Sequence, residues 1–165
     1  FDITGTIAKG LASPERICIR KRDTLTKKDC FLEGNAKMFS HVMIGTNDLD
    51  KAKTFYDKLL GTLGVPPGVV DRHRIFYRTK TGTFSVSKPI NGKPATPANG
   101  GTIGFTAASA EEADSWHATG IANGGTTCED PPGIREGGGI KMYIAYLRDP
   151  DGNKLCAIYR LPREA

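Results

Sequence analysis

The feature that most constrains the fold of this chain is a pattern of apolar and turn-forming residues that occurs twice. Each occurrence begins with a short apolar and β-branched stretch, continues with apolar residues at helical spacing, and ends in further short stretches of strand type. The helix caps of the two occurrences, Asp48 and Ser109, stand about 60 residues apart. This repetition predicts two copies of one strand–helix–three-strand module, formed by internal duplication.

The first copy begins with a predicted strand at Phe39–Thr46. Asp48 then provides an N-cap, apolar residues recur at helical spacing as far as Leu63, and Gly64 ends the helix. Residues 89–101 are rich in Pro, Gly and Asn and predict a linker to the second copy. The three short strands predicted between the helix and the linker are Val69–Asp71, Arg74–Arg78 and Thr83–Ser87.

The second copy follows the same plan. Thr102–Ala107 is a predicted strand, and Ser109 with Glu112 forms a capping box before a helix that ends at Gly124. The segment 130–139 is rich in Pro and Gly and predicts a loop. The remaining predicted strands are Thr126–Cys128, Lys141–Arg148 and Lys154–Arg160, the last two joined by the type I turn Asp149-Pro150-Asp151-Gly152.

These elements predict an α+β fold in which two βαβββ modules form a cupped mixed sheet. We expect residues 38–162 to be a single domain, because the chain is long enough for one sizeable core. Residues 1–37 lack sustained periodicity and predict an N-terminal extension, explained by an alternate start at Met38, by pairing with a sheet edge, or by a sequence added upstream. The expected parts of the domain are module one at 38–88, the linker at 89–101 and module two at 102–162.

The body of the chain is close to electrically neutral, which argues against nucleic-acid binding. The net charge of +5 divides into +3 from residues 1–37, with eight basic and five acidic residues, and +2 from the rest. The basic run Arg20–Arg22 could attract nucleic acid, but three charges are ordinary at a solvated strand end.

The sequence also argues against a membrane-spanning protein and against a cysteine-bound zinc site. The longest apolar runs are a few residues, too short for a membrane span. No lysine-led apolar stretch with a small-residue cleavage site opens the chain, which favours the cytoplasm. The cysteine spacings fit no zinc motif, so we expect thiols, with a Cys18–Cys30 disulfide as the alternative. The four cysteines are Cys18, Cys30, Cys128 and Cys156.

Alternation along the strands predicts which side chains point away from the helices. Val42 and Ile44 share a face that should lie under the first helix, so His41 points the other way. A concave sheet would gather the residues of this uncovered side into one cup. The same alternation places three further side chains there: Ser85, Thr102 and Cys156.

Three segments resemble the glyoxalase/bleomycin-resistance/extradiol-dioxygenase (vicinal-oxygen-chelate) superfamily. They are Ser40-His41-Val42, the helix from Leu49 to Phe55-Tyr56, and Tyr146–Leu155 with its Asp-Pro-Asp-Gly-Asn run. The resemblance covers roughly residues 38–162, and the Asp-Pro-Asp-Gly-Asn run is fairly specific when a strand–helix–strands module precedes it. The resemblance implies a glyoxalase/bleomycin-resistance-like fold with a small-molecule cup, and a homodimer, because cups in this family are often completed across subunits.

In that family the cup holds a divalent metal through four strand positions, commonly His, Glu or His, His, and Glu. The resemblance maps these positions onto His41, Ser85, Thr102 and Cys156, of which His41 alone matches. Hydroxyl groups are poor ligands at neutral pH, so two strong ligands are too few for a stable tetrahedral site. The resemblance therefore implies a cup without the usual metal or other cofactor. The alternative is a divalent ion (Zn, Ni, Fe or Mn) on His41 and Cys156.

His41 is the first candidate for catalysis, as a general base or a group that orients a ligand; a histidine that is only hydrogen-bonded has equal weight. Cys156 is the second, as a nucleophile activated by His41, although a small buried apolar role is favoured. Arg74 could hold an anionic ligand group or lie in a solvated turn. Tyr146 could offer its hydroxyl or belong to the core. The predicted ligand-binding residues are His41, Ser85, Thr102, Tyr146, Cys156 and Arg74.

The sequence thus predicts a glyoxalase-like protein that binds or converts a small molecule in a cup lined by His41. Conversion would be lyase-like or isomerase-like, as the resemblance implies. A first alternative is a non-catalytic protein that sequesters an antibiotic-like small molecule. A second is a metal-dependent lyase or dioxygenase with an atypical ligand set.

Overall fold

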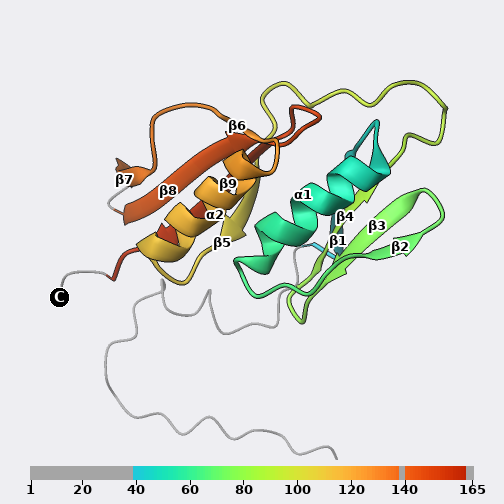
Figure 1. Ribbon diagram of the computed structural model, residues 1–165. Helices are drawn as coiled ribbons and strands as arrows, with labels where there is room; N and C mark the ends of the chain where they lie inside the picture. Colours follow the sequence, from blue (N-terminus) through green and yellow to red (C-terminus); the bar gives the residue numbers. More distant parts are fainter. Residues whose placement is uncertain (1–38, 138–139, 163–165) are drawn as a thin grey trace, which may run out of the picture. The chain divides into compact units, whose positions relative to one another are not determined.

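The computed structural model describes residues 39–137 and 140–162, all within the compact unit Lys37–Ala165. The predictions for residues 1–37, including those for Cys18 and Cys30, lie outside the described residues. Figure 1 shows two groups of elements, each a sheet with one helix against it. The fold is α+β with two mixed sheets, as the sequence predicts. Among the described residues, no helix is long and apolar enough to cross a membrane.

The first sheet, called sheet A, has four strands in the order β1-β4-β3-β2. β1 and β4 pair in parallel, and this crossover places the intervening helix on one face of the sheet. The other two pairings are antiparallel. The strands of sheet A are β1 (His41–Gly45), β2 (Val69–Asp71), β3 (Arg74–Arg78) and β4 (Thr83–Ser87).

The second sheet, called sheet B, repeats this plan. The order of its main path is β5-β9-β8-β6, with β5 and β9 parallel and the other pairs antiparallel. Its strands are β5 (Ile103–Thr106), β6 (Thr126–Thr127), β7 (Gly133–Gly137), β8 (Ile140–Arg148) and β9 (Lys154–Arg160).

The prediction of a loop at 130–139 is wrong in its middle part, because β7 forms an antiparallel pair with β8 there. The pairs run from Gly133 opposite Ile144 to Gly137 opposite Ile140. β8 is nine residues long and needs partners for its backbone groups on both edges. The glycines and prolines that suggested a loop surround only three strand-compatible residues, 134–136, so composition hid the strand.

Both helices begin at the predicted caps. The side chain of Asp48 accepts hydrogen bonds from backbone N–H groups of the first turn, and that of Ser109 accepts one from Glu112. The Glu112 carboxylate accepts from the backbone N–H of Ala108, one residue earlier than in the usual capping box. The helices are α1 (Leu49–Gly61) and α2 (Ala110–Ala122).

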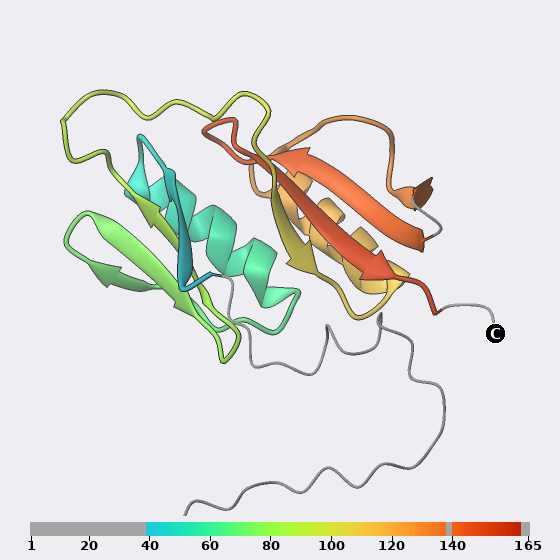
Figure 2. The same ribbon diagram turned by 180° about the vertical axis from the view of Figure 1, so that it is seen from behind.

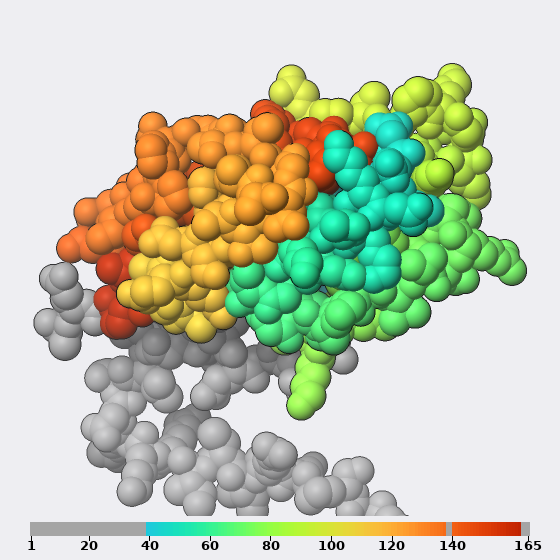
Figure 3. Space-filling view, in the orientation of Figure 1, coloured from blue at the N-terminus to red at the C-terminus, as the bar shows by residue number. Residues whose placement is uncertain are grey.

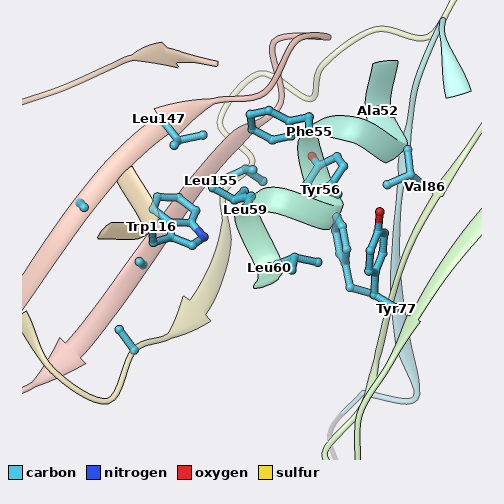
Figure 4. Close-up of a cluster of buried hydrophobic side chains, with 14 of the residues drawn as sticks. Ala52, Phe55, Tyr56, Leu59, Leu60, Tyr77, Val86, Trp116, Leu147 and Leu155 are labelled. Carbon is cyan, nitrogen blue, oxygen red and sulfur yellow. The ribbon is translucent and has the colours of Figure 1, made fainter. Parts of the chain in front are cut away.

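One apolar core joins the two modules. Figure 3 shows α1 and α2 side by side, and they are in contact. In Figure 4, Phe55 and Leu59 of α1 point toward Trp116 of α2 and toward Leu147 and Leu155 of sheet B. All five side chains are fully buried. The two helices therefore pack against each other, each on the inner face of one sheet, and no described helix covers the opposite face of either sheet (Figure 2).

The turn between β8 and β9 links the second module to the first. The backbone N–H of Gly152 donates to the carbonyl of Asp149 over 2.9 Å, which confirms the predicted turn. The Asp151 carboxylate accepts from the Thr46 hydroxyl at 2.5 Å and from the backbone N–H of Asn47 at 3.0 Å. The Asn153 amide donates to the carbonyl of Gly45 at the end of β1. The same turn that closes the last hairpin thus holds the β1–α1 junction.

Candidate functional site

Strand register decides which side chains of sheet A face away from α1. Val42 pairs with Phe84, and both contribute to the core. His41 precedes Val42 and Ser85 follows Phe84, and successive side chains of a strand point to opposite faces. His41 and Ser85 therefore lie on the face of the sheet away from the helix, which we call the open face. Arg74 pairs with Ser87 and also lies on the open face.

The same argument applies to sheet B. Leu155 and Ala157 belong to the core under α2, so Cys156 lies on the open face. Cys156 pairs with Tyr146 on one side and with Gly104 on the other, and these three positions form one row across the open face.

A cavity of about 400 Å³ lies between β1, β4, the end of α1, and β5. It therefore draws on both modules within the compact unit. Its apolar wall consists of Phe39, Val42, Leu60, Leu63, Val65, Phe84, Ile103 and Phe105. Its polar side chains are His41, Ser40, Tyr77, Thr79, Thr81, Thr83 and Thr106.

Of the six predicted ligand-binding residues, His41 lines this cavity and the other five do not. Ser85 is fully buried, and its hydroxyl donates to the carbonyl of Val42 at 3.2 Å. Thr102 is exposed just before β5. The Nε atom of Arg74 is buried without a hydrogen-bond partner among the described residues. Tyr146 and Cys156 lie on sheet B, as described above.

His41 is exposed at the start of β1. The hydroxyl oxygen of Ser40 lies 2.9 Å from its Nδ1 atom. This contact holds one ring nitrogen and leaves Nε2 as the atom through which the imidazole can meet a ligand.

The environment of Cys156 favours a packing role over a nucleophilic one. Burial raises the pKa of its thiol to about 11, a shift that the nearby Lys154 opposes and Cys128 adds to. The thiol is therefore protonated at neutral pH, whereas the thiolate is the nucleophilic form. Burial also raises the pKa of the Tyr146 hydroxyl, which leaves it a hydrogen-bond donor.

Two of the four positions that the resemblance maps to metal ligands have protein surroundings of their own. The Ser85 hydroxyl donates to the carbonyl of Val42, and the Cys156 side chain is buried. Among residues 39–137 and 140–162, no group of three or more His, Cys, Asp or Glu side chains is placed to hold a metal ion.

Sequence reasoning missed the hydroxyl-bearing side of the cavity. Thr79, Thr81 and Thr83 come from the β3–β4 turn and the start of β4, and Thr106 comes from the end of β5. Threonine is common in strands and turns, so only the juxtaposition of the two edges distinguishes these four residues.

Most of the chain is similar to known proteins of one superfamily. A family model described as Glyoxalase/Bleomycin resistance protein/Dioxygenase superfamily matches residues 38–157. The crystal structure of a glyoxalase/bleomycin resistance protein from Albidiferax ferrireducens T118 is 63% identical, with a TM-score of 0.73. The similarity covers 74% of this chain and 98% of that one. A search of curated proteins found no match.

More distant structures share the fold alone. A glyoxalase/bleomycin resistance protein/dioxygenase family enzyme from Burkholderia phytofirmans PsJN is 19% identical, with a TM-score of 0.58 over 74% of this chain and 98% of that one. Lactoylglutathione lyase from Agrobacterium tumefaciens is 21% identical, with a TM-score of 0.53 over 74% and 93% of the two chains.

Proposed function

Because the chain belongs to the Glyoxalase/Bleomycin resistance protein/Dioxygenase superfamily, we propose that it binds or converts a small organic molecule at a hollow lined by His41. In this proposal the site works without the four-ligand metal centre of that superfamily. Residues 38–162 act as one domain of two modules, and 1–37 are an extension to it.

The observation that carries the proposal is the cavity of about 400 Å³ with His41 at its side. Sites for small molecules are typically concave, mostly apolar and supplied with a few polar groups. This cavity has an apolar wall, one imidazole and a set of hydroxyl groups that can orient a ligand.

The lining of the cavity also favours the sequestering alternative over conversion. Among the described residues, its lining includes no carboxylate, amine, guanidinium or thiol side chain. General acid–base catalysis usually needs a second titratable group within hydrogen-bond reach of the substrate. The Tyr77 hydroxyl already donates to Asp57, so His41 is the lining residue best suited to proton transfer, and binding without turnover is the second candidate function.

Homodimer formation is part of the proposal. The face of each sheet that lies away from the helix carries His41, Ser85 and Met43 in sheet A, and Tyr146 and Cys156 in sheet B. Met43 is 41% exposed there, although its side chain is apolar. A second copy that covers these faces would bury Met43 and bring the two halves of the predicted cup together. Sedimentation equilibrium tests this, with a monomer at micromolar concentration as the contrary result.

A fragment screen tests the binding site. Organic fragments of about 10–20 non-hydrogen atoms are screened by ligand-observed NMR against the wild-type chain, His41→Ala and the control His73→Ala, which lies outside the cavity lining. We expect hits that bind wild type and His73→Ala and are weakened by His41→Ala. A set of hits indifferent to His41 would contradict the proposal.

Two further readouts separate the candidate functions. If hits are converted, product should form with wild type and should no longer form with His41→Ala at ligand concentrations that saturate the variant; if hits are only bound, no product appears with either protein. Metal analysis of the purified chain addresses the metal-dependent alternative. We expect less than stoichiometric Zn, Ni, Fe or Mn, and a stoichiometric ion lost in His41→Ala would favour the alternative.

A further inference from the structure

Two cations lie directly opposite one another at the end of the last hairpin. Arg148 of β8 pairs in register with Lys154 of β9. Both occupy the open face of sheet B, since each lies two residues from the Tyr146–Cys156 pair. Like charges at directly opposite positions of an antiparallel ladder are destabilising unless an anion lies between or beside them.

A cavity adjoins this pair. It measures about 320 Å³ and is lined by Arg148, Lys154 and the glycine-containing segment 97–101 of the linker. Gly100 has φ +83, a left-handed conformation that glycine adopts without strain. The cavity thus combines two cationic side chains with a turn of exposed backbone, which are groups that bind oxyanions.

The charges around the cavity are not balanced by the described residues. Lys154 forms an ion pair with Glu129, and its ammonium also lies 4.8 Å from the centre of the Tyr146 ring. Arg148 donates to the carbonyl of Gly152 at 2.8 Å and forms no ion pair with a described carboxylate. The set of Arg148, Lys154 and Glu129 therefore keeps one excess positive charge.

Glu129 itself is held in an unfavourable backbone conformation. Its φ of 61° lies in the left-handed region, which costs a non-glycine residue roughly 1 kcal/mol or more. Its carboxylate is about half exposed, whereas the Lys154 side chain is largely buried. Glu129 is thus the described carboxylate that competes with a bound anion for Lys154.

We propose that Arg148, Lys154 and the backbone of residues 97–101 form a binding site for the anionic group, carboxylate or phosphate, of a small molecule. The lining of this cavity shares no residue with that of the His41 cavity, so this is a second site, for organic acids or phosphate esters, that goes beyond the proposed function. Arg148 supplies a planar fork of donors, Lys154 a point charge, and Glu129 leaves Lys154 when the anion binds.

Inorganic phosphate and acetate are the probes. Each is titrated into the isotope-labelled full chain, and the backbone amide signals of residues 98–101 are followed by NMR. We expect saturable shifts at these amides. Lys154→Met should weaken binding by about tenfold or more, because a charge-assisted hydrogen bond is lost, and Lys154→Arg should restore it. Lys51→Met, an exposed lysine of α1, is the matched control and should bind as wild type does.

Glu129→Gln should change the affinity for phosphate in the opposite direction to Lys154→Met. It removes the competing carboxylate while it preserves the size of the side chain, so phosphate should bind more tightly than to wild type. Non-saturable shifts, or affinities unchanged in both Lys154→Met and Glu129→Gln, would overturn the site. Preference for phosphate or for acetate identifies which oxyanion the site takes. Fragments that still bind at His41 in Lys154→Met would show that the proposed function survives the failure of this inference.

Discussion

The phenol of Tyr56 donates a 2.6 Å hydrogen bond to the carboxylate of Asp149, which lies 93 residues further along the chain. Tyr56 belongs to α1 of the first module, and Asp149 opens the turn between β8 and β9 of the second. Burial, followed by the charge of Asp149, raises the pKa of the Tyr56 hydroxyl, so it remains the donor throughout the neutral range. This buried hydrogen bond links the two modules, and residues of both modules line the His41 cavity.

Removal of this contact should destabilise the protein. Tyr56→Phe keeps the ring but leaves one Asp149 oxygen with fewer donors in a buried position, so unfolding free energy should fall by about 1–3 kcal/mol. Tyr143→Phe is the matched control, because its hydroxyl also donates to a carboxylate, that of Asp114, but at an exposed position. Urea denaturation measures both. Equal losses in the two variants would contradict a special role for Tyr56.

Asp151 and Thr46 should be energetically coupled in their contributions to the free energy of unfolding. The Thr46 hydroxyl is fully buried and donates to Asp151 across the module boundary. A double-mutant cycle of Thr46→Val and Asp151→Asn should give a coupling energy of about 0.5–3 kcal/mol. Additive effects, measured by the same denaturation assay, would mean that the two residues stabilise their modules separately.

A side chain at Gly120 should lower the stability of the protein, although Gly120 lies in a helix. A Cβ atom there would collide with Cδ2 of Leu147 and stand 3.0 Å from Cδ1 of Leu59. Gly120→Ala should therefore cost about 1–3 kcal/mol of stability despite the better helix propensity of alanine. Gly61→Ala, at a helical position with nothing within 4 Å, should stabilise by about 0.5–1 kcal/mol. The thermal midpoints of the two variants should move in opposite directions; a shared direction would contradict the close approach of α1 and α2.

Stability should decline in acid partly because of Asp57. Partial burial alone would raise the pKa of this carboxyl, but hydrogen bonds from Lys53, from the backbone N–H of Gly68 and from the Tyr77 hydroxyl outweigh it and lower the pKa. A lowered folded-state pKa contributes stability that is present above the unfolded value, about 3.9, and is lost as pH falls through the folded value.

Asp57→Asn should therefore be less stable than wild type at pH 7, by about 1 kcal/mol, and the difference should shrink towards pH 2–3. Urea denaturation across this range measures it. Asp71→Asn, an exposed carboxylate of β2, serves as the control for loss of charge. A difference that grows in acid would reverse the sign and refute the explanation.

The sequence predicts the modules well because their signals are local. The cap residues Asp48 and Ser109 and the turn at Asp149–Gly152 act within a few residues, and alternation alone assigns His41 and Cys156 to the faces where they lie. β7 was missed because its formation depends on the free edge of β8, a partner that its own composition does not reveal.

The site is harder to predict than the fold. Parity places Ser85 correctly on the open face, but it says nothing of the Val42 carbonyl that accepts its hydroxyl. The Thr106 side of the cavity and the Arg148–Lys154 cavity both depend on how segments distant in sequence approach one another. Such tertiary juxtapositions leave no periodic trace in one sequence.

The most direct test of the central claim is an amide NMR map of a screened fragment bound to the chain after chelator treatment. The account predicts saturable shifts at His41, Thr83 and Thr106 in the metal-stripped protein, with the same affinity before and after chelation. Binding that disappears with chelation and returns with added divalent metal, or shifts confined to residues outside the His41 cavity, would contradict it.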